Sequence, residues 1–217
     1  MSDEMENKTE QIEETPVKQK RSGSVFYIVI AVLMALILAV RIWWVNSFGV
    51  VNVDGMSMMC TLEHGDELLM KFVKDGKGLK RGDVIVVNAS KYEEVKDGDG
   101  NKINFLIKRL IAVEGDKVRC KDGLIEICYR GESDYVPLIE SYAYYDGNMS
   151  EYDFSEYVVE EGEIFFLGDN RLHSCDSRYQ EWGGSHLDDL YKATDVYAVV
   201  PEWAIEHKDM IAKIFNF

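Results

Sequence analysis

Residues 105–113 read Phe-Leu-Ile-Lys-Arg-Leu-Ile-Ala-Val, an apolar run that two basic residues interrupt. A run of this length and composition predicts a β-strand, in which successive side chains point to opposite faces. The alternation places Lys108 on a face with apolar neighbours, namely Leu106, Leu110 and Ala112. Because burial disfavours the ammonium form, we expect the pKa of Lys108 to be lowered, which would give a neutral amine that can act as a base.

A serine that could use this base lies upstream, in the stretch Asp-Gly-Met-Ser-Met-Met-Cys-Thr-Leu of residues 54–62. A serine hydroxyl is a weak nucleophile until a base lies beside it, and serine with lysine is a known variant of the serine-protease arrangement. Ser57 is therefore the candidate nucleophile and Lys108 the candidate general base. On these two residues alone a simpler interpretation stays open, in which Ser57 is a turn residue and Lys108 extends its ammonium to solvent.

The rest of the chain after residue 46 shows a pattern typical of an antiparallel sheet. Short β-branched runs are separated by Gly-Asp, Asp-Gly and Glu-Gly pairs, and they cover residues 50–53, 67–73, 84–87, 117–120, 124–127, 163–167 and 196–200. We interpret the polar stretches 88–102 and 130–160 as surface insertions, and we expect a short helix over 203–214. The predicted fold is mainly β, an antiparallel sheet or barrel-like domain.

The N-terminal part predicts a membrane anchor. Residues 1–21 hold six acids against four bases and no aromatic residue, which is typical of a disordered tail. Residues 22–40 carry no charge, and the run continues past Arg41 to residue 45, which is enough for a helix across a bilayer. A cleavable signal peptide is the alternative, but Arg41 and two tryptophans stand where a cleavage site would be expected. The expected organisation is a tail over 1–21, an anchor over 22–45 and one domain over 46–217.

Charge orients this anchor and limits the partners. Lys18, Lys20 and Arg21 precede it closely, so the positive-inside rule places the N-terminus in the cytoplasm and residues 46–217 outside. The formal net charge of the chain is −15. Such an acidic chain is not expected to bind nucleic acid, because phosphates are neutralised by a basic face.

Two of the four cysteines flank a predicted hairpin turn at Asp122-Gly123. A two-residue turn pairs Cys120 with Ile125 and leaves Cys128 opposite Lys117. The two thiols then do not face each other, and we expect no bridge between them.

Other arrangements of reactive residues were weighed. A disulfide between Cys60 and Cys175 stays open, as does a triad of His64 or His173 with Asp169 or Asp176. Asp97, Asp99 and Asn101 resemble the start of an EF-hand loop, but lysines stand where its glycine and its last glutamate are required. The cysteines and histidines lack zinc-ligand spacing, so we expect no metal and no cofactor.

Four ordered motifs resemble those of the type I signal peptidases. Residues 57–62 match the family's Ser-Met-x-Pro-Thr-Leu, except that Cys60 replaces proline. Arg-Gly-Asp-Val at 81–84 and Lys-Arg with a later Gly-Asp at 108–116 follow in the family's order. The stretch 168–178 resembles the last motif, Gly-Asp-Asn-Arg-x-x-Ser-x-Asp-Ser-Arg. A single motif is weak evidence, but the ordered set covers most of the chain from 50 to 183.

The resemblance implies a membrane-bound enzyme that removes signal peptides from exported preproteins after small residues, of the Ala-x-Ala type. It makes Ser57 the nucleophile and Lys108 the base, with an acyl-enzyme intermediate. It implies that Ser174 hydrogen-bonds the lysine, that Asp176 and Arg178 form a supporting ion pair, and that Asp169 and Arg109 are structural. The Ser57 amide and a donor near Gly55 are expected to hold the oxyanion. The implied partners are signal peptides, the lipid bilayer of the plasma membrane and the secretion translocon.

Two rival functions stay open from the sequence. One is a signal-peptidase-like factor that assembles exported or pilus proteins without cutting them, which would be expected to lack the serine or the lysine. The other is a self-cleaving LexA-type regulator, which the anchor and the acidic charge oppose.

Overall fold

The structure is a computed structural model that describes residues 22–91, 100–145, 153–178 and 191–215. The predicted tail over 1–21 and the EF-hand-like residues Asp97 and Asp99 lie outside these ranges. The chain divides into two compact units, Met1–Trp44 and Val45–Phe217.

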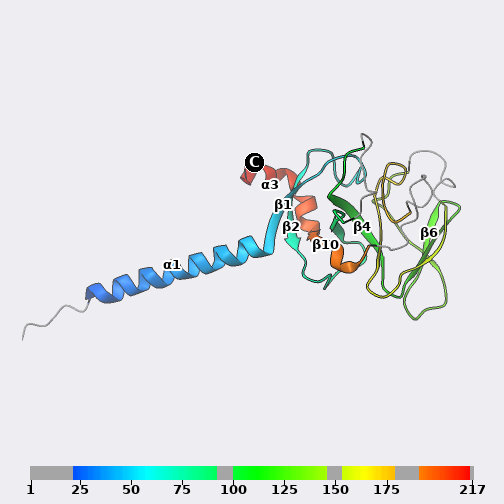
Figure 1. Cartoon of the computed structure of the whole chain (residues 1–217). Coiled ribbons are helices and arrows are strands. Elements are labelled where there is room, and N and C mark those ends of the chain that lie inside the picture. Colours follow the sequence, from blue (N-terminus) through cyan, green and yellow to red (C-terminus); the bar gives the residue numbers. More distant parts are fainter. Residues whose placement is uncertain (1–21, 92–99, 146–152, 179–190, 216–217) are drawn as a thin grey trace, which may run out of the picture. The chain divides into compact units, whose positions relative to one another are not determined.

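The first unit consists, where described, of most of helix α1, Ser22–Ser47 (Figure 1). Its stretch Gly23–Ser47 contains an 18-residue window with a mean hydropathy of 2.8, and it is long and apolar enough to cross a membrane. The helix runs two residues past the predicted end of the anchor at residue 45, and the chain then enters the first strand directly.

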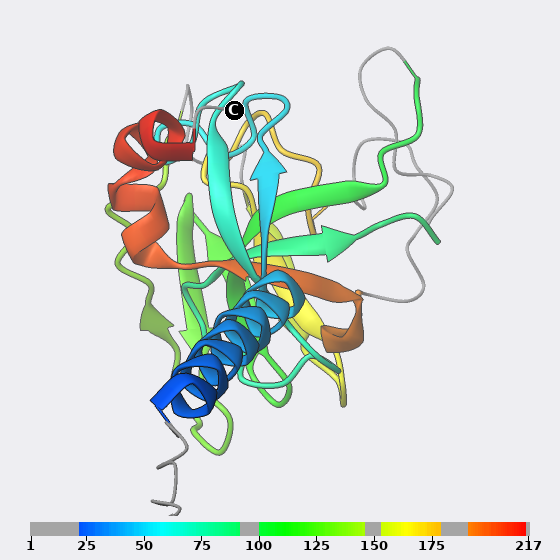
Figure 2. The same cartoon turned by 90° about the vertical axis from the view of Figure 1, so that its left-hand side faces the viewer.

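The second unit contains a six-stranded sheet that carries the candidate nucleophile's turn and the candidate base. Its strands are antiparallel to their neighbours. In spatial order they are β1 Phe48–Asn52, β2 Glu67–Phe72, β10 Val196–Val200, β3 Val84–Asn88, β4 Phe105–Val113 and β9 Ile164–Leu167 (Figures 1 and 2). Each of these strands falls on a predicted run, and the expectation of a mainly β, antiparallel fold is confirmed. The described strands do not close into a barrel.

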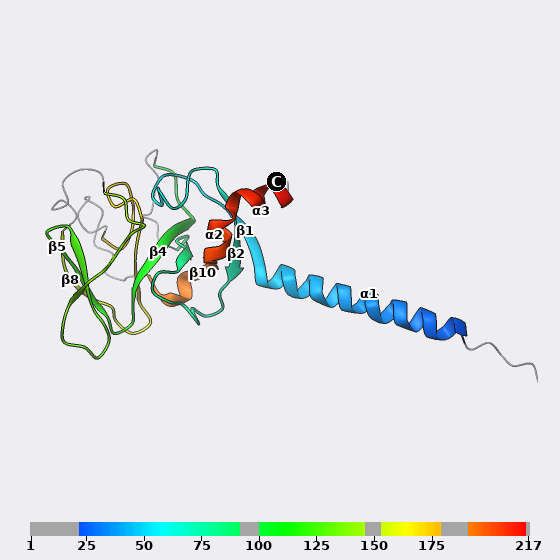
Figure 3. The same ribbon diagram turned by 180° about the vertical axis from the view of Figure 1, so that it is seen from behind.

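A second, four-stranded antiparallel sheet follows β4. Its order is β7 Val136–Pro137, β6 Leu124–Cys128, β5 Lys117–Lys121 and β8 Phe154–Val158 (Figures 1 and 3). The β5–β6 hairpin pairs Cys120 with Ile125 and Lys117 with Cys128, as predicted. All four cysteines are free, including Cys60 and Cys175.

The interpretation of residues 130–160 as a surface insertion was wrong. Strands β7 and β8 lie within this stretch and belong to the second sheet. The rings of Phe154 and Tyr157 lie 5.5 Å from the ring of Phe165, a core residue of β9. These two strands were not predicted, because each has too few alternating apolar residues to stand out among the many tyrosines and acidic residues of this stretch.

Strand β4 connects the two sheets and determines where Lys108 points. Leu106, Lys108 and Leu110 are buried, as the alternation predicted. The pairing with β9 shifts between Leu110 and Ala112, so Ala112 packs in the core of the second sheet instead of beside Leu110. The irregularity re-aims the strand after Leu110 and leaves Lys108 on the face of the first sheet.

Two short helices end the described chain, where one was predicted over 203–214. Helix α2 spans Glu202–Glu206 and α3 spans Lys208–Phe215, with His207 between them at φ −114° and ψ 21°. Both pack against β2 (Figure 3). Ala204 and Ile211 bury their side chains in one cluster with Met58 and Leu62, so the C-terminal helices support the turn that carries Ser57. A single 3₁₀ turn at Ala193–Asp195 precedes β10.

Candidate active site

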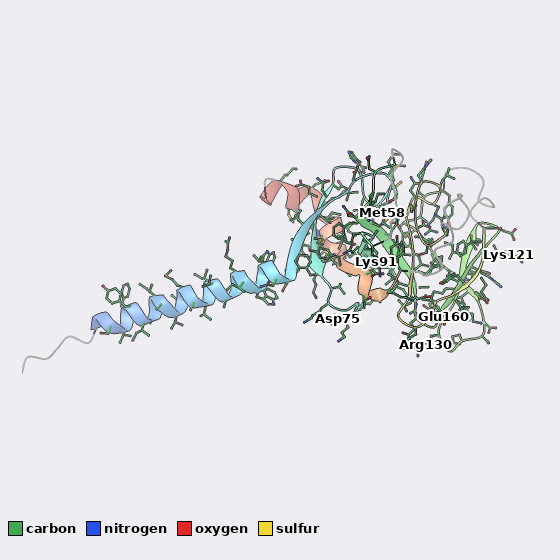
Figure 4. The ribbon with its side chains drawn as sticks, in the orientation of Figure 1. Met58, Asp75, Lys91, Lys121, Arg130 and Glu160 are labelled. Carbon is green, nitrogen blue, oxygen red and sulfur yellow. The ribbon has the colours of Figure 1, made fainter. Side chains whose placement is uncertain are left out.

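Ser57 and Lys108 lie side by side in the structure. The Nζ atom of Lys108 is 2.7 Å from the Oγ atom of Ser57 and 2.9 Å from the carbonyl oxygen of Ile107. Ser57 sits in a tight turn between β1 and β2, in which the amides of Thr61 and Leu62 donate to the carbonyl of Met58. The Met58 side chain is buried in the core and fixes this turn (Figure 4).

Burial sets the protonation of the lysine. Lys108 is 2% exposed. Desolvation lowers its pKa from 10.5 to about 8, although the charges of Asp176, Cys175 and Asp169 act in the opposite direction. Roughly a tenth of the side chain is therefore a neutral amine at pH 7, far more than for a free lysine. The neutral amine can accept the proton of the adjacent Ser57 hydroxyl.

Arg109 points to the opposite side of β4 and pairs with Asp169. Its Nε and Nη2 atoms donate to the two carboxylate oxygens at 2.8 and 2.6 Å, and its Nη1 donates to the carbonyl of Gly82. The hydroxyl of Thr61 donates to the same carboxylate at 2.5 Å. Asp169 is fully buried, so this network ties the turn that carries Ser57 to β4 and to the segment after β9.

The second predicted ion pair, between Asp176 and Arg178, is also present. Arg178 donates from Nε and Nη2 to the two oxygens at 2.9 and 2.8 Å, and the amide of Gly168 donates to the carboxylate at 3.0 Å. Burial alone would raise the pKa of Asp176, but the Arg178 charge and the hydrogen bonds from Arg178 and Gly168 lower it. A carboxylate is thus kept ionised close to Lys108.

The hydrogen bond that the resemblance implied between Ser174 and Lys108 is not formed. The Ser174 hydroxyl is buried and has no partner of normal hydrogen-bond geometry among the described residues, although it is close enough to Asp176 to help lower the pKa of that carboxyl. The amine instead faces Ser57 and Ile107, because Ser174 packs against the backbone of Gly168. Ser174 is therefore a neighbour of the pair and not a ligand of the amine.

Gly168 lies between these groups with no room for a side chain. A Cβ atom at this position would overlap the Ser174 hydroxyl and would lie 2.5 Å from the carbonyl oxygen of Ser57. Two positions later, Asn170 holds the same turn: its amide donates to the Ser57 carbonyl at 3.0 Å, and its side chain donates to the Met56 carbonyl at 3.2 Å. The 168–170 backbone is therefore in direct contact with the turn that carries Ser57.

The histidine alternatives are not supported where the structure describes them. His64 is exposed, and its Nδ1 atom accepts the Gly55 amide at 3.3 Å and lies 3.2 Å from Asp54. The backbone amide of His173 donates to Asn170. Neither histidine makes a hydrogen bond with Ser57 among the described contacts. Gly55 has φ +92°, and its amide faces His64, so its part in an oxyanion site stays a prediction.

Sequence reasoning missed several residues that surround the site. Thr61 was assigned no role beyond its place in a motif. The buried Asp116 accepts two hydrogen bonds of 2.6 Å from Arg81, and this contact was not predicted. Glu140 and Tyr142, from the supposed insertion, contact Arg171 and Arg109. The partners in these contacts are far apart in the sequence, so no local sequence pattern predicted that they would pair.

Comparison with known proteins places this geometry in a family. The sequence model of the family described as "Signal peptidase, peptidase S26" matches residues 24–197. Signal peptidase I of Bacillus licheniformis is 34% identical over 160 residues, which cover 73% of this chain and 80% of that protein. Signal peptidase I T of Bacillus subtilis (strain 168) is 35% identical over 153 residues, covering 70% and 72%.

A solved structure of a signal peptidase I from Enterococcus faecalis V583 is also similar, with 25% identity and a TM-score of 0.38, over 58% of this chain and 98% of that one. The family match extends over α1 and both sheets as far as Tyr197 in β10. The chain belongs to the signal peptidase family, peptidase S26.

Proposed function

We propose that this protein is a membrane-bound serine endopeptidase that removes N-terminal signal peptides from exported preproteins. The observation that carries the proposal is the 2.7 Å contact between the Ser57 hydroxyl and the buried Lys108 amine. A non-catalytic assembly factor would have no need of such a pair. Membership in the signal peptidase family supplies the class of substrate.

The chemistry we propose is acyl transfer in two steps. The neutral Lys108 amine takes the Ser57 proton as Oγ attacks the scissile carbonyl, and the resulting ammonium returns a proton to the leaving amine. The products of this step are the ester at Ser57 and the freed mature protein. Lys108 then removes a proton from water, which attacks the ester, and the ammonium returns this proton to the Ser57 oxygen as the signal peptide leaves with a free carboxylate. The Ser57 amide and a donor near Gly55 would hold the oxyanion.

The substrate we propose is an extended segment with small side chains at the first and third positions before the cut, as in Ala-x-Ala. An extended peptide beside a strand is held mainly through its backbone, and its alternate side chains determine the specificity. Val45, at the end of the predicted anchor, precedes Ser57 by twelve residues. A short connection would keep the cut close to the membrane, where the apolar part of a signal peptide ends.

The location we propose is the plasma membrane, with one pass through it. Helix α1 is the anchor, the N-terminus is cytoplasmic and the sheets lie outside, because the basic residues cluster before the helix. The bilayer and the secretion translocon would then be partners, and nucleic acid would not. Asp169, Arg109, Asp176 and Arg178 would act by holding the strands that carry the pair.

The function is tested by incubating the detergent-solubilised protein with a preprotein and mapping the products by mass spectrometry. We expect one cut that follows small residues at the first and third positions. Scattered cuts, or an intact preprotein at every enzyme concentration, would contradict the proposal.

The pH dependence tests the role of Lys108. The base works only when it is deprotonated, so kcat/KM, which reports the pKa of the free enzyme, should rise with pH through about 8 and then level off. Lys108→Arg should be inactive across this range, because a guanidinium stays protonated. The measurement is kcat/KM against pH for both proteins. A rate that climbs only near pH 10, or an active arginine variant, would contradict a desolvated lysine base.

Ser174 is expected to matter less than the pair itself. After proton transfer the Lys108 ammonium has three N–H groups but faces only two acceptors, the Ser57 oxygen and the Ile107 carbonyl. The Ser174 oxygen, which has no hydrogen-bond partner among the described residues, is buried nearby. A hydrogen bond to a charged group contributes about 1.5–3 kcal/mol, so Ser174→Ala should lower kcat roughly 10- to 100-fold. Steady-state kinetics would check this, and Ser133→Ala, an exposed serine outside the site, is the control. A loss as complete as that of Lys108→Ala, or no loss, would remove this role.

A further inference from the structure

Residues 140–145, which we call the tyrosine segment, lie across the motif that touches the nucleophile's turn. The amide of Tyr144 donates to the carbonyl of Asp169 at 2.7 Å, and the amide of Arg171 donates to the carbonyl of Tyr144 at 3.0 Å. Tyr144 and Asn170 thus pair like two residues of a parallel sheet. The segment is bonded to the backbone of the 168–171 motif on both sides of Asn170.

A buried ion pair fixes the segment to the same motif. Both terminal nitrogens of Arg171 donate to the carboxylate of Glu140, and the contact from Nη1 is 2.7 Å long. The two side chains are 1% and 5% exposed, respectively. Burial alone would lower the pKa of Arg171, but the hydrogen bond and charge of Glu140 raise it above its usual value. Glu140 therefore keeps Arg171 charged and fixed in orientation.

Two tyrosine rings complete this arrangement. The hydroxyls of Tyr142 and Tyr145 donate to Glu140 at 3.1 and 3.2 Å, and Arg171 donates to the Tyr145 hydroxyl at 3.1 Å. The Tyr142 ring lies over the guanidinium of Arg109, 3.9 Å from its centre. The segment thus contacts Arg109, the residue that follows the candidate base, as well as Arg171.

From Arg171 the contacts lead to the nucleophile. Its Nε atom donates to the carbonyl of Gly168 at 3.0 Å, and its own carbonyl accepts Arg178 at 2.7 Å. Gly168 packs against the Ser57 carbonyl, and Asn170 donates to it. The path from the Glu140 carboxylate to the Ser57 backbone therefore runs through Arg171 and the 168–170 backbone, with no gap in contact.

We propose that Glu140 is a positioning residue that holds Ser57 against Lys108 through Arg171 and the 168–170 backbone. The inference rests on the proposed function, since the reaction it measures is preprotein cleavage. Within the part of the chain that the structure describes, no hydrogen bond or ion pair joins Glu140 to Ser57 or Lys108 directly. Its effect therefore reaches the reaction through its neighbours, of which Arg171 is the one with a charged, buried contact.

Loss of the Glu140 charge should have two kinetic consequences. Displacement of Ser57 from Lys108 slows the chemical step and leaves substrate binding intact, so kcat should fall about 10- to 100-fold while KM changes less than about twofold. A looser 168–176 segment should also admit water to Lys108, which faces Asp176, Cys175 and Asp169. The rise of kcat with pH should therefore move to higher pH, by about half a unit or more.

The variants are Glu140→Gln, which keeps the shape and removes the charge, and Tyr145→Phe, which removes one hydroxyl from the same site. The matched control is Glu126→Gln. Glu126 accepts Arg119 at 2.7 Å, and Arg119 in turn lies under the Tyr135 ring, so the control breaks the same kind of Arg–Glu–Tyr group. Arg119 and Glu126 belong to the β5–β6 hairpin, whose labelled residue Lys121 lies far from Met58 in Figure 4.

The experiment measures kcat, KM and the kcat–pH profile of the full-length protein, with rates normalised to the folded fraction from circular dichroism. We expect a lower kcat and a pH profile moved to higher pH in Glu140→Gln, smaller changes of the same kind in Tyr145→Phe, and neither change in Glu126→Gln. The proposal is overturned if both site variants keep the wild-type kcat and profile per folded molecule, or if KM alone changes. A wild-type protein that cuts no preprotein would instead refute the proposed function, so the two failures are distinguishable.

Discussion

Ser57→Ala and Lys108→Ala are each expected to reduce preprotein cleavage by at least about 10⁴-fold. The two side chains meet at 2.7 Å, and in the proposed mechanism they act as a unit, so the double variant should be hardly slower than either single one. Alanine at position 108 replaces a buried ionisable group with an apolar one, and alanine at 57 removes one oxygen. Both proteins should therefore fold normally.

The measurement is single-turnover cleavage of a preprotein, with circular dichroism as the control for folding. Cys60→Ala is the matched variant, because Cys60 is an exposed nucleophile three residues after Ser57. It should keep wild-type activity. Cleavage that survives in Ser57→Ala and disappears on further Cys60→Ala would show that the thiol carries the reaction.

Gly168→Ala has the second largest expected effect. The added Cβ would overlap the Ser174 hydroxyl and press on the Ser57 carbonyl at 2.5 Å, and the Ser57 contact is with backbone that cannot rotate away. The nucleophile's turn must shift, and a displacement of about 1 Å can cost about 10²-fold in rate. We therefore expect kcat to fall at least that far.

Gly131→Ala separates this steric effect from general loss of glycine. Gly131 has φ +85° with open space around the position of a Cβ, so alanine there strains the backbone without a clash. It should lower the stability to urea slightly, by about 1 kcal/mol, and leave kcat unchanged. If Gly168→Ala cleaves as fast as Gly131→Ala, the close contact between the 168 backbone and Ser57 has no catalytic importance.

The strands of the first sheet and the residues of the pair were predictable because their signals are local. Alternation over 105–113 is enough to bury Lys108, and a turn between two apolar runs is enough to place Ser57 at a loop. The hairpin register at Cys120 followed from its two-residue turn. The irregularity after Leu110, which moves Ala112 into the core of the second sheet, could not be predicted from the sequence.

The environment of the pair depends on contacts between distant segments, and these could not be read from the sequence. Glu140 meets Arg171 across 31 positions, and Thr61 meets Asp169 across 108. Neither partner has an apolar pattern that predicts its burial. The polar composition of 130–160 indicated a surface-exposed stretch, whereas the Glu140 side chain is buried in an ion pair with Arg171.

Rapid acid quenching of the first turnover, followed by peptide mapping, tests the central claim most directly. In the proposed mechanism deacylation consumes the ester at Ser57, so the adduct must be trapped before the second step. We predict an added mass equal to the signal peptide acyl group on the peptide that contains Ser57, localised to that residue by fragmentation. The adduct should be absent in Lys108→Ala. An adduct on Cys60, or full cleavage with no adduct at any quench time, would contradict the account.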